Sequence, residues 1–247
     1  MSIFKPIIVA NWKANKTERE ALSWIEKVGS FLKKKSGEIV LCPPFVFISP
    51  LKARLKNLGF SDFIHLGSQN ISHYDSGAYT GEVTAEQLSG LVEYSLIGHS
   101  ERRRLFDEKE KDIVQKINLA KKWQIKPILL VDLPQLNEVS LSFASERQRT
   151  TDSAHGNLYA GEDLIVCYEP VSAISSSGKY HPDDPDKAFG EAKEILVRNS
   201  KAIVLYGGSV NQLDAQSFLR VGFSGFVVGQ ASLNEDDFIG LLTASFI

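Results

Sequence analysis

One pattern repeats along the whole chain: a short apolar run followed by a longer, more polar segment. Eight such runs occur within the 247 residues, and each is nearly continuous in apolar character. The runs cover residues 6–12, 38–44, 63–69, 94–100, 126–132, 164–170, 202–208 and 225–231. Continuous apolar runs are typical of parallel strands that are covered on both faces. The chain is therefore expected to build a parallel sheet.

Several of the intervening segments have the apolar period of an amphipathic helix. They cover residues 18–35, 109–123, 186–197 and 211–221. A further helix is expected in the polar, serine-rich segment 134–160. About eight strand–helix units in this length favour an α/β fold, a (β/α)₈ barrel, as a single domain over residues 1–247. An open, doubly wound parallel sheet is the structural alternative.

Composition and charge exclude several classes of protein. The net charge of -2 and the pI near 6.2 give no electrostatic reason to expect binding to nucleic acid or to an anionic membrane. No apolar run approaches the roughly 20 residues that a membrane span needs. The amino-terminal sequence lacks the pattern of a signal peptide, so we expect a cytoplasmic protein. Cys42 and Cys167 lie inside apolar runs and are interpreted as buried thiols in a reducing compartment, not as a disulfide or a metal site.

Polar residues with catalytic potential follow three of the predicted strands. Lys13 comes just after the first, where it is either a ligand for an anion or a solvated lysine. His99 ends the fourth, where a helix beginning behind it can hold the imidazole neutral. Glu169 ends the sixth, either as a catalytic base under a mobile flap or as a surface acid. The active sites of barrel enzymes lie at this end of the strands.

Glycines follow the seventh and eighth predicted strands. Gly207 and Gly208 end one run and Gly229 lies in the other. Glycines let backbone N–H groups approach a ligand closely, although each also fits a simple tight turn. In a barrel, the loops after these two strands are the usual place for a phosphate group. Together, the five strand ends predict a cation, an electrophile, a base and an anion cradle around one opening.

Six longer motifs occur in an order and spacing that resemble the triosephosphate isomerase family. They are NWK (11–13), GAYTGEVTAEQL (77–88), IGHSERR (97–103), YEPV followed by AI (168–174), YGGSV (206–210) and GFVVG followed by ASL (225–233). The resemblance covers nearly the whole chain except about 132–162. It implies a TIM barrel and the interconversion of dihydroxyacetone phosphate and glyceraldehyde 3-phosphate, with no metal and no organic cofactor.

The resemblance also implies a role for each catalytic residue. Glu169 would remove a proton from the carbon beside the carbonyl group and return it to the neighbouring carbon. His99, as a neutral imidazole, would polarise the carbonyl oxygen. Lys13 and Asn11 would stabilise the charge of the enediolate. Glu101, in the SER triplet, would be the second acid of the site.

Phosphate binding and assembly are implied in the same way. Backbone amides around Ser175, Gly208, Ser209, Gly229 and Gln230 would hold the phosphate group. The family is a homodimer in which the loop before the GAYTGE motif inserts into the neighbouring subunit. Thr80 would then lie close to Asn11 and Lys13 of the partner subunit.

The chain departs from the family pattern mainly in the flap after Glu169. Ser172 stands where the family has tryptophan, and Ser175–Ser177 replace a glycine-threonine-glycine tip. We expect closure to survive with altered rates. Gln230 replaces a glycine of the phosphate loop, and its N–H still binds phosphate if its backbone angles permit. Asp132-Leu133 replace a glycine-glutamate pair, so a carboxylate that supports the arginines after Glu101 is expected to be missing, unless Asp132 substitutes for it from one position away.

These departures motivate a second functional hypothesis of another class. The chain would then be a non-catalytic, phosphate-binding relative that serves as a binding or scaffold protein. A different sugar-phosphate isomerase on the same barrel explains the phosphate loops, but it does not explain the paired IGHSERR and YEPV motifs. Retention of every residue that does chemistry favours the active isomerase.

Overall fold

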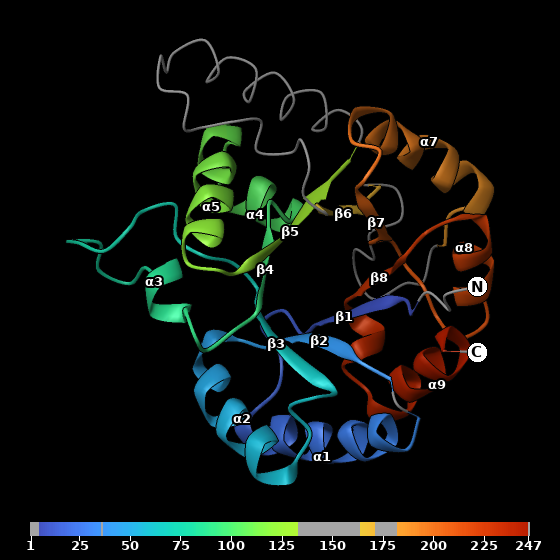
Figure 1. Ribbon diagram of the computed structural model, residues 1–247, viewed down its shortest axis with the longest axis horizontal. Helices are drawn as coiled ribbons and strands as arrows, with labels where there is room; N and C mark the ends of the chain where they lie inside the picture. Colours follow the sequence, from blue (N-terminus) through green and yellow to red (C-terminus); the bar gives the residue numbers. More distant parts are fainter. Residues whose placement is uncertain (1–4, 36, 133–163, 171–181, 247) are drawn as a thin grey trace.

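The computed structural model describes residues 5–35, 37–132, 164–170 and 182–246. Within them, eight parallel strands close into a barrel in sequence order, with β8 paired to β1 (Figure 1). The strands are β1 (Ile7–Asn11), β2 (Ile39–Cys42), β3 (Ile64–Ser68), β4 (Tyr94–Ile97), β5 (Lys126–Val131), β6 (Ile165–Tyr168), β7 (Ile203–Tyr206) and β8 (Gly225–Val228). The predicted (β/α)₈ barrel is confirmed, and the open sheet is wrong because β1 and β8 leave no free edge.

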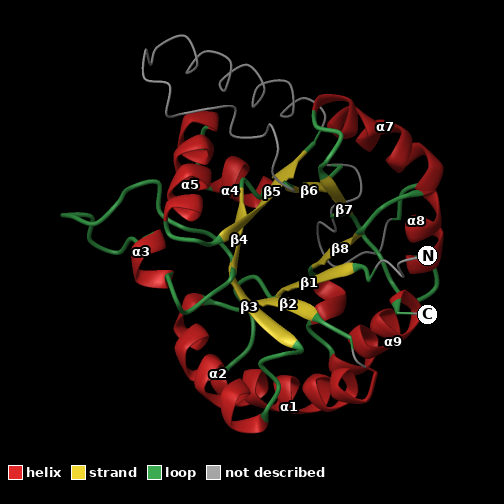
Figure 2. Cartoon of the chain, viewed as in Figure 1, coloured by secondary structure: helices red, strands yellow, loops and turns green. Residues whose placement is uncertain are grey.

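Helices surround the barrel as an outer layer (Figure 2). They are α1 (Glu18–Lys35), α2 (Phe45–Leu58), α3 (Ala85–Leu88), α4 (Ser100–Leu105), α5 (Glu110–Lys122), α7 (Pro185–Arg198), α8 (Ala215–Val221), the 3₁₀ helix η3 (Gln230–Ser232) and α9 (Glu235–Ser245). No helix among the described residues is long and apolar enough to cross a bilayer. The helix expected in 134–160 lies outside the described residues, and a single domain over 1–247 stays a prediction.

Local signals account for where these helices begin and end. The stripe on α1 buries Ala21, Ile25 and Val28 among others, as its apolar period predicts. The helix predicted at 211–221 begins later, at Ala215. A turn precedes it, in which the backbone N–H of Asn211 donates to the Asp214 carboxylate at 2.8 Å. Helix α2 was not predicted, because Pro50 inside it interrupts the helical signal.

The core has two layers because side chains alternate along each strand. One layer fills the barrel interior, and the other packs between strands and helices. The interior layer contains Val9, Val40, Cys42, Leu96, Ile128, Leu130, Ile165, Cys167, Leu205 and Val227. Both cysteines are unpaired and buried here, as predicted. Burial raises the pKa of both thiols, so they remain protonated packing residues.

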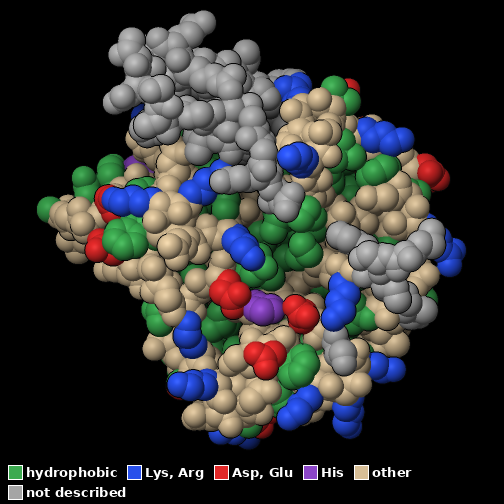
Figure 3. Space-filling model, viewed as in Figure 1, with side chains coloured by type: hydrophobic (Ala, Val, Ile, Leu, Met, Phe, Trp, Pro, Cys, Tyr) green, Lys and Arg blue, Asp and Glu red, His purple; other side chains and the backbone are tan. Residues whose placement is uncertain are grey.

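A charged cluster lies at the amino ends of β2, β3 and β4. The His65 ring nitrogens lie 3.0 Å from a Glu93 carboxylate oxygen and 3.5 Å from a Glu38 oxygen. Lys5 is 3.6 Å from the other oxygen of Glu38. Figure 3 shows a histidine between acidic side chains over these strands. This cluster is open to solvent and lies at the barrel end opposite to the predicted catalytic residues.

Candidate active site

The alternation along the strands carries four predicted site residues to the mouth of the barrel. Asn11, Glu169, Gly207 and Gly229 each stand two positions beyond an interior strand residue. Their side-chain positions therefore point toward the barrel axis at its carboxyl end. At Gly207 the absence of a side chain is required, because a Cβ would lie 2.5 Å from the Cys167 sulfur. Strand geometry thus explains why these types of residue occur at these positions.

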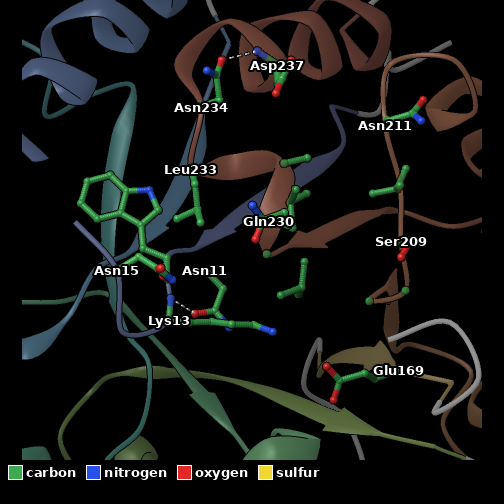
Figure 4. A pocket seen from close by; sticks show the side chains of 18 of the residues that line it. Asn11, Lys13, Asn15, Glu169, Ser209, Asn211, Gln230, Leu233, Asn234 and Asp237 are labelled. Atoms are coloured by element: carbon green, nitrogen blue, oxygen red, sulfur yellow. Dashed lines mark hydrogen bonds between the residues drawn. The ribbon is translucent and has the colours of Figure 1, made fainter. Parts of the chain in front are cut away.

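A cavity of about 510 Å³ opens at this end (Figure 4). The predicted site residues that line it are Asn11, Lys13, His99, Glu169, Gly208, Ser209, Gly229 and Gln230. Five strand ends therefore converge on one space, as the sequence predicted. Lys13 and Glu169 extend toward each other from opposite sides of the cavity (Figure 4). Glu101 does not line the cavity, but its carboxylate accepts a hydrogen bond of 2.7 Å from the Lys13 ammonium.

The His99 ring lies beside the Glu169 carboxylate. The backbone N–H of Glu101, in the first turn of α4, donates to Nδ1 of His99 at 3.2 Å. A nitrogen that accepts carries no proton, so this contact places the proton of a neutral ring on Nε2. Nε2 lies 3.3 Å from a Glu169 carboxylate oxygen. Both residues are buried, with 6% and 5% of their surfaces exposed.

The second oxygen of Glu169 has its own partner. It accepts a hydrogen bond of 3.0 Å from the backbone N–H of Ser100. The carboxylate is thus held at the side of the cavity by the start of α4, where backbone N–H groups favour a negative charge.

Lys13 adopts a strained backbone that its neighbours enforce. Its φ is +52°, a value that is uncommon for residues other than glycine. The Asn11 side chain accepts the Lys13 backbone N–H at 3.1 Å, and Gln69 donates to the Lys13 carbonyl at 2.8 Å. Gln69 also donates to the Cys42 carbonyl at 3.0 Å. Strain of this kind is typical of functional sites, and it aims the ammonium into the cavity.

The pair of Lys13 and Glu101 is electrostatically matched. Burial raises the pKa of Glu101, but the hydrogen bond and charge of Lys13, together with smaller effects of His99 and Arg104, bring the net shift below the ordinary value. Glu101 is therefore ionised at neutral pH and keeps the ammonium at the cavity edge. The resemblance made Glu101 the second acid of the site; the contacts make it the partner of Lys13.

The two glycine loops form the other side of the cavity. Gly229 brings backbone close to Lys13, because a Cβ there would lie 3.3 Å from the Lys13 Cε atom. Gln230 opens the short helix η3 and is not among the non-glycine residues with positive φ. Replacing a glycine by glutamine therefore introduces no backbone strain. Gln230 and Ser209 both reach the cavity wall (Figure 4).

Sequence reasoning missed the carboxylates that support α4. Glu108 accepts from Arg102 at 2.6 Å and from Lys116 at 2.5 Å, and Arg103 is paired with Glu110. Leu133 has no carboxylate, but Glu108 and Glu110 give the arginines after Glu101 carboxylate partners of their own. Gln69 was missed as well, although its place at the end of β3 follows the same strand-end rule that found Lys13.

Three predicted features cannot be placed in the cavity. Ser172 and Ser175–Ser177 lie outside the described residues. Thr80 is exposed on the segment between β3 and α3, which extends away from the barrel (Figure 1). Its contact with a partner subunit stays a prediction.

Comparison with known proteins agrees with this geometry. A family model described as triosephosphate isomerase matches residues 6–245. The chain belongs to the triosephosphate isomerase family. It is 36% identical over 248 residues to triosephosphate isomerase from Alkaliphilus metalliredigens (strain QYMF), covering 96% of this chain and 98% of the relative. It is 31% identical over 256 residues to the enzyme of that name from Shewanella sp. (strain MR-4), covering 98% of each.

Proposed function

We propose that the chain interconverts dihydroxyacetone phosphate and glyceraldehyde 3-phosphate by proton transfer through an enediolate. Glu169 removes a proton from the carbon next to the carbonyl and returns it to the former carbonyl carbon. His99 donates its Nε2–H to the carbonyl oxygen, on which negative charge develops. Lys13 and Asn11 stabilise the same charge from the β1 side of the cavity. His99 then takes up the hydroxyl proton of the neighbouring carbon, which becomes the new carbonyl carbon. The ring returns to its neutral form, and the proton balance closes within the site.

The observation that carries this proposal is the contact between Glu169 and His99. A carboxylate 3.3 Å from a ring nitrogen that bears a proton is a base beside an electrophile. Both open into the cavity that also contains the glycine loops. A molecule with a carbonyl at one end and a phosphate at the other would reach both halves of this cavity. The proposal places the phosphate against the backbone of Gly208, Ser209, Gly229 and Gln230, with Ser175 as a further contact.

Steady-state isomerisation of glyceraldehyde 3-phosphate tests the proposal. The purified wild type is compared with Glu169→Gln, which keeps the shape of the side chain but cannot act as a base. We expect kcat to fall by about 10³-fold or more while phosphate affinity is retained. Glu93→Gln is the matched control, since Glu93 lies at the other end of the barrel. Its kcat should equal that of the wild type.

Two results would contradict the proposal. The first is full activity in Glu169→Gln, which would remove this residue from the reaction. The second is a wild type no faster than Glu169→Gln. The protein would then be a non-catalytic phosphate-binding relative, despite its family.

We also propose that the protein is a cytoplasmic homodimer. Tyr74 and Tyr79 stack at 3.9 Å on the projecting segment before α3, and both are exposed. Leu105 and Phe106, at the end of α4, are also large exposed apolar residues. Such groups fit a subunit interface better than bulk water. The two unpaired thiols agree with a reducing compartment. Sedimentation equilibrium tests the dimer, and a monomer at micromolar concentration would contradict it.

A further inference from the structure

Lys16 has an unusual backbone conformation outside the cavity. Its φ is +74°, a second positive value for a lysine in the short connection from β1 to α1. A side chain other than glycine is disfavoured there. Lys16 does not line the cavity, so contact with a bound molecule does not explain it. Its own contacts do.

The Lys16 ammonium joins the β1–α1 connection to the β8–α9 connection. It donates a hydrogen bond of 2.7 Å to the backbone carbonyl of Leu233. It also lies 5.2 Å from the ring centroid of the buried Trp12, within the range of a cation–π contact. Glu20 and Glu235 lie near enough to act on its charge. The ammonium is thus held by groups from both ends of the chain.

Leu233 is the residue that closes the phosphate loop. It follows η3 directly, and its N–H donates to the carbonyl of Gln230 at 3.1 Å. Ser232 donates twice to the carbonyl of Gly229, at 2.9 Å from its backbone and 2.7 Å from its hydroxyl. Residues 229–233 therefore form one hydrogen-bonded unit. Fixing the carbonyl of Leu233 fixes Gly229 and Gln230 at the cavity wall.

We propose that Lys16 is a positioning residue that holds the phosphate-binding segment 229–233 against the β1–α1 connection. This inference rests on the proposed function, because it assigns the phosphate group to that segment. The Lys13 end of the connection has separate anchors, Asn11 and Gln69. Loss of the Lys16 ammonium should therefore weaken binding of the phosphate group and leave the proton-transfer steps at the carbonyl group unchanged.

Kinetics with and without the phosphate group test this separation. Lys16→Met keeps the aliphatic stem and removes the ammonium. We expect KM for glyceraldehyde 3-phosphate to rise about three- to tenfold, the usual effect of losing one hydrogen bond, with kcat nearly unchanged. The kcat/KM for glyceraldehyde, which has no phosphate, should equal that of the wild type. Lys16→Arg should restore most of the affinity, because a guanidinium can also donate to the carbonyl.

Lys16→Gly separates positioning from stability. Glycine relieves the backbone strain, so Tm should hold or rise, whereas KM should rise as in Lys16→Met. A merely structural role would make KM and Tm change together. Lys52→Met is the matched control, since the Lys52 ammonium donates to the carbonyls of Gly90 and Leu91 away from the cavity. Its KM should not change.

Three outcomes would overturn the inference. One is an unchanged KM for glyceraldehyde 3-phosphate in both Lys16→Met and Lys16→Gly. Another is an equal loss on glyceraldehyde, which would assign the effect to the Lys13 end. The third applies if the wild type has no isomerase activity, so that the proposed function fails by itself. The affinity for inorganic phosphate is then measured by calorimetry in the wild type and in Lys16→Met. Equal or undetectable binding in the two proteins overturns the positioning role, and weaker binding in the variant supports it.

Discussion

Each end of the barrel carries a histidine near two glutamates, and the two groups differ in what the histidine can do. At the carboxyl end, His99 lies near Glu101 and Glu169. At the amino end, His65 lies between Glu38 and Glu93. The residue types are the same. The two groups differ in their hydrogen bonds and in their exposure to solvent, and these two differences decide which histidine can take part in a reaction.

The difference arises from one backbone N–H and from burial. At His99 the first turn of α4 donates to Nδ1, so the ring is neutral and its other nitrogen donates. At His65 both ring nitrogens face carboxylates, and no backbone N–H donates to either nitrogen among the hydrogen bonds of the described residues. The His65 side chain is 23% exposed and that of His99 is 8% exposed. A buried ring that faces a cavity suits catalysis, and a solvated polar cluster suits the surface.

The largest effect should come from replacing the two histidines in turn. His99→Gln removes the donor that polarises the carbonyl, and we expect kcat to fall by about 10³-fold, near 4 kcal/mol of transition-state stabilisation. His65→Gln should leave kcat unchanged, because its cluster lies at the barrel end opposite to the cavity. Steady-state kinetics of both variants measures the contrast. Equal losses would mean that the two ends communicate and that the comparison fails.

The buried Glu108 carboxylate, which supports α4 at the catalytic end of the barrel, should contribute more to the free energy of unfolding than the exposed cluster does. Glu108 has 3% of its side chain exposed and accepts from both Arg102 and Lys116, whose side chain is equally buried. Burial lowers the pKa of Lys116 even though Glu108 raises it, so the pair depends on close contact. Glu108→Gln leaves the buried Lys116 and the half-buried Arg102 without this counter-charge, and it should lower the free energy of unfolding by about 3 kcal/mol.

Urea denaturation measures this loss, with Glu93→Gln as the control from the exposed end. The control should lose less than about 1 kcal/mol, because solvent screens its pair. A Glu108→Gln protein as stable as the control would show that the buried network does not support α4.

Sequence patterns predicted the barrel because all eight strands have a continuous apolar run. They also predicted Lys13, His99 and Glu169 as neighbours, because parallel strands bring their carboxyl ends together. They did not predict Gln69, Glu108 or Lys16. Those residues act through backbone carbonyls or through contacts between distant segments, and single polar residues in connections carry no periodic signal. The resemblance gave Glu101 a role, but only the fold shows that its partner is Lys13.

Acid should weaken the catalytic end through Glu101. Its pKa in the folded protein lies below the ordinary value of 4.5, so its stabilising contribution is complete above that value. The contribution is lost as the pH falls through the lowered pKa. The side chain is 33% exposed, so screening makes the effect small. Thermal unfolding from pH 7 to pH 3 should show a steeper acid decline for the wild type than for Glu101→Gln; parallel curves would remove Glu101 as a source of the acid sensitivity.

The smallest effect should come from the stability of the exposed cluster. Replacing His65 by glutamine keeps one amide donor but removes the second, so one of the two carboxylate contacts is lost. We expect the free energy of unfolding to fall by less than about 1 kcal/mol, because the pairs are open to solvent. High salt should reduce the difference further, since it screens the charges of the two exposed carboxylates. Urea titrations in low and high salt measure this change in the free energy of unfolding. A loss near 3 kcal/mol that salt does not alter would contradict the prediction. It would show that His65 contributes through packing in the barrel and not through its contacts with the two glutamates.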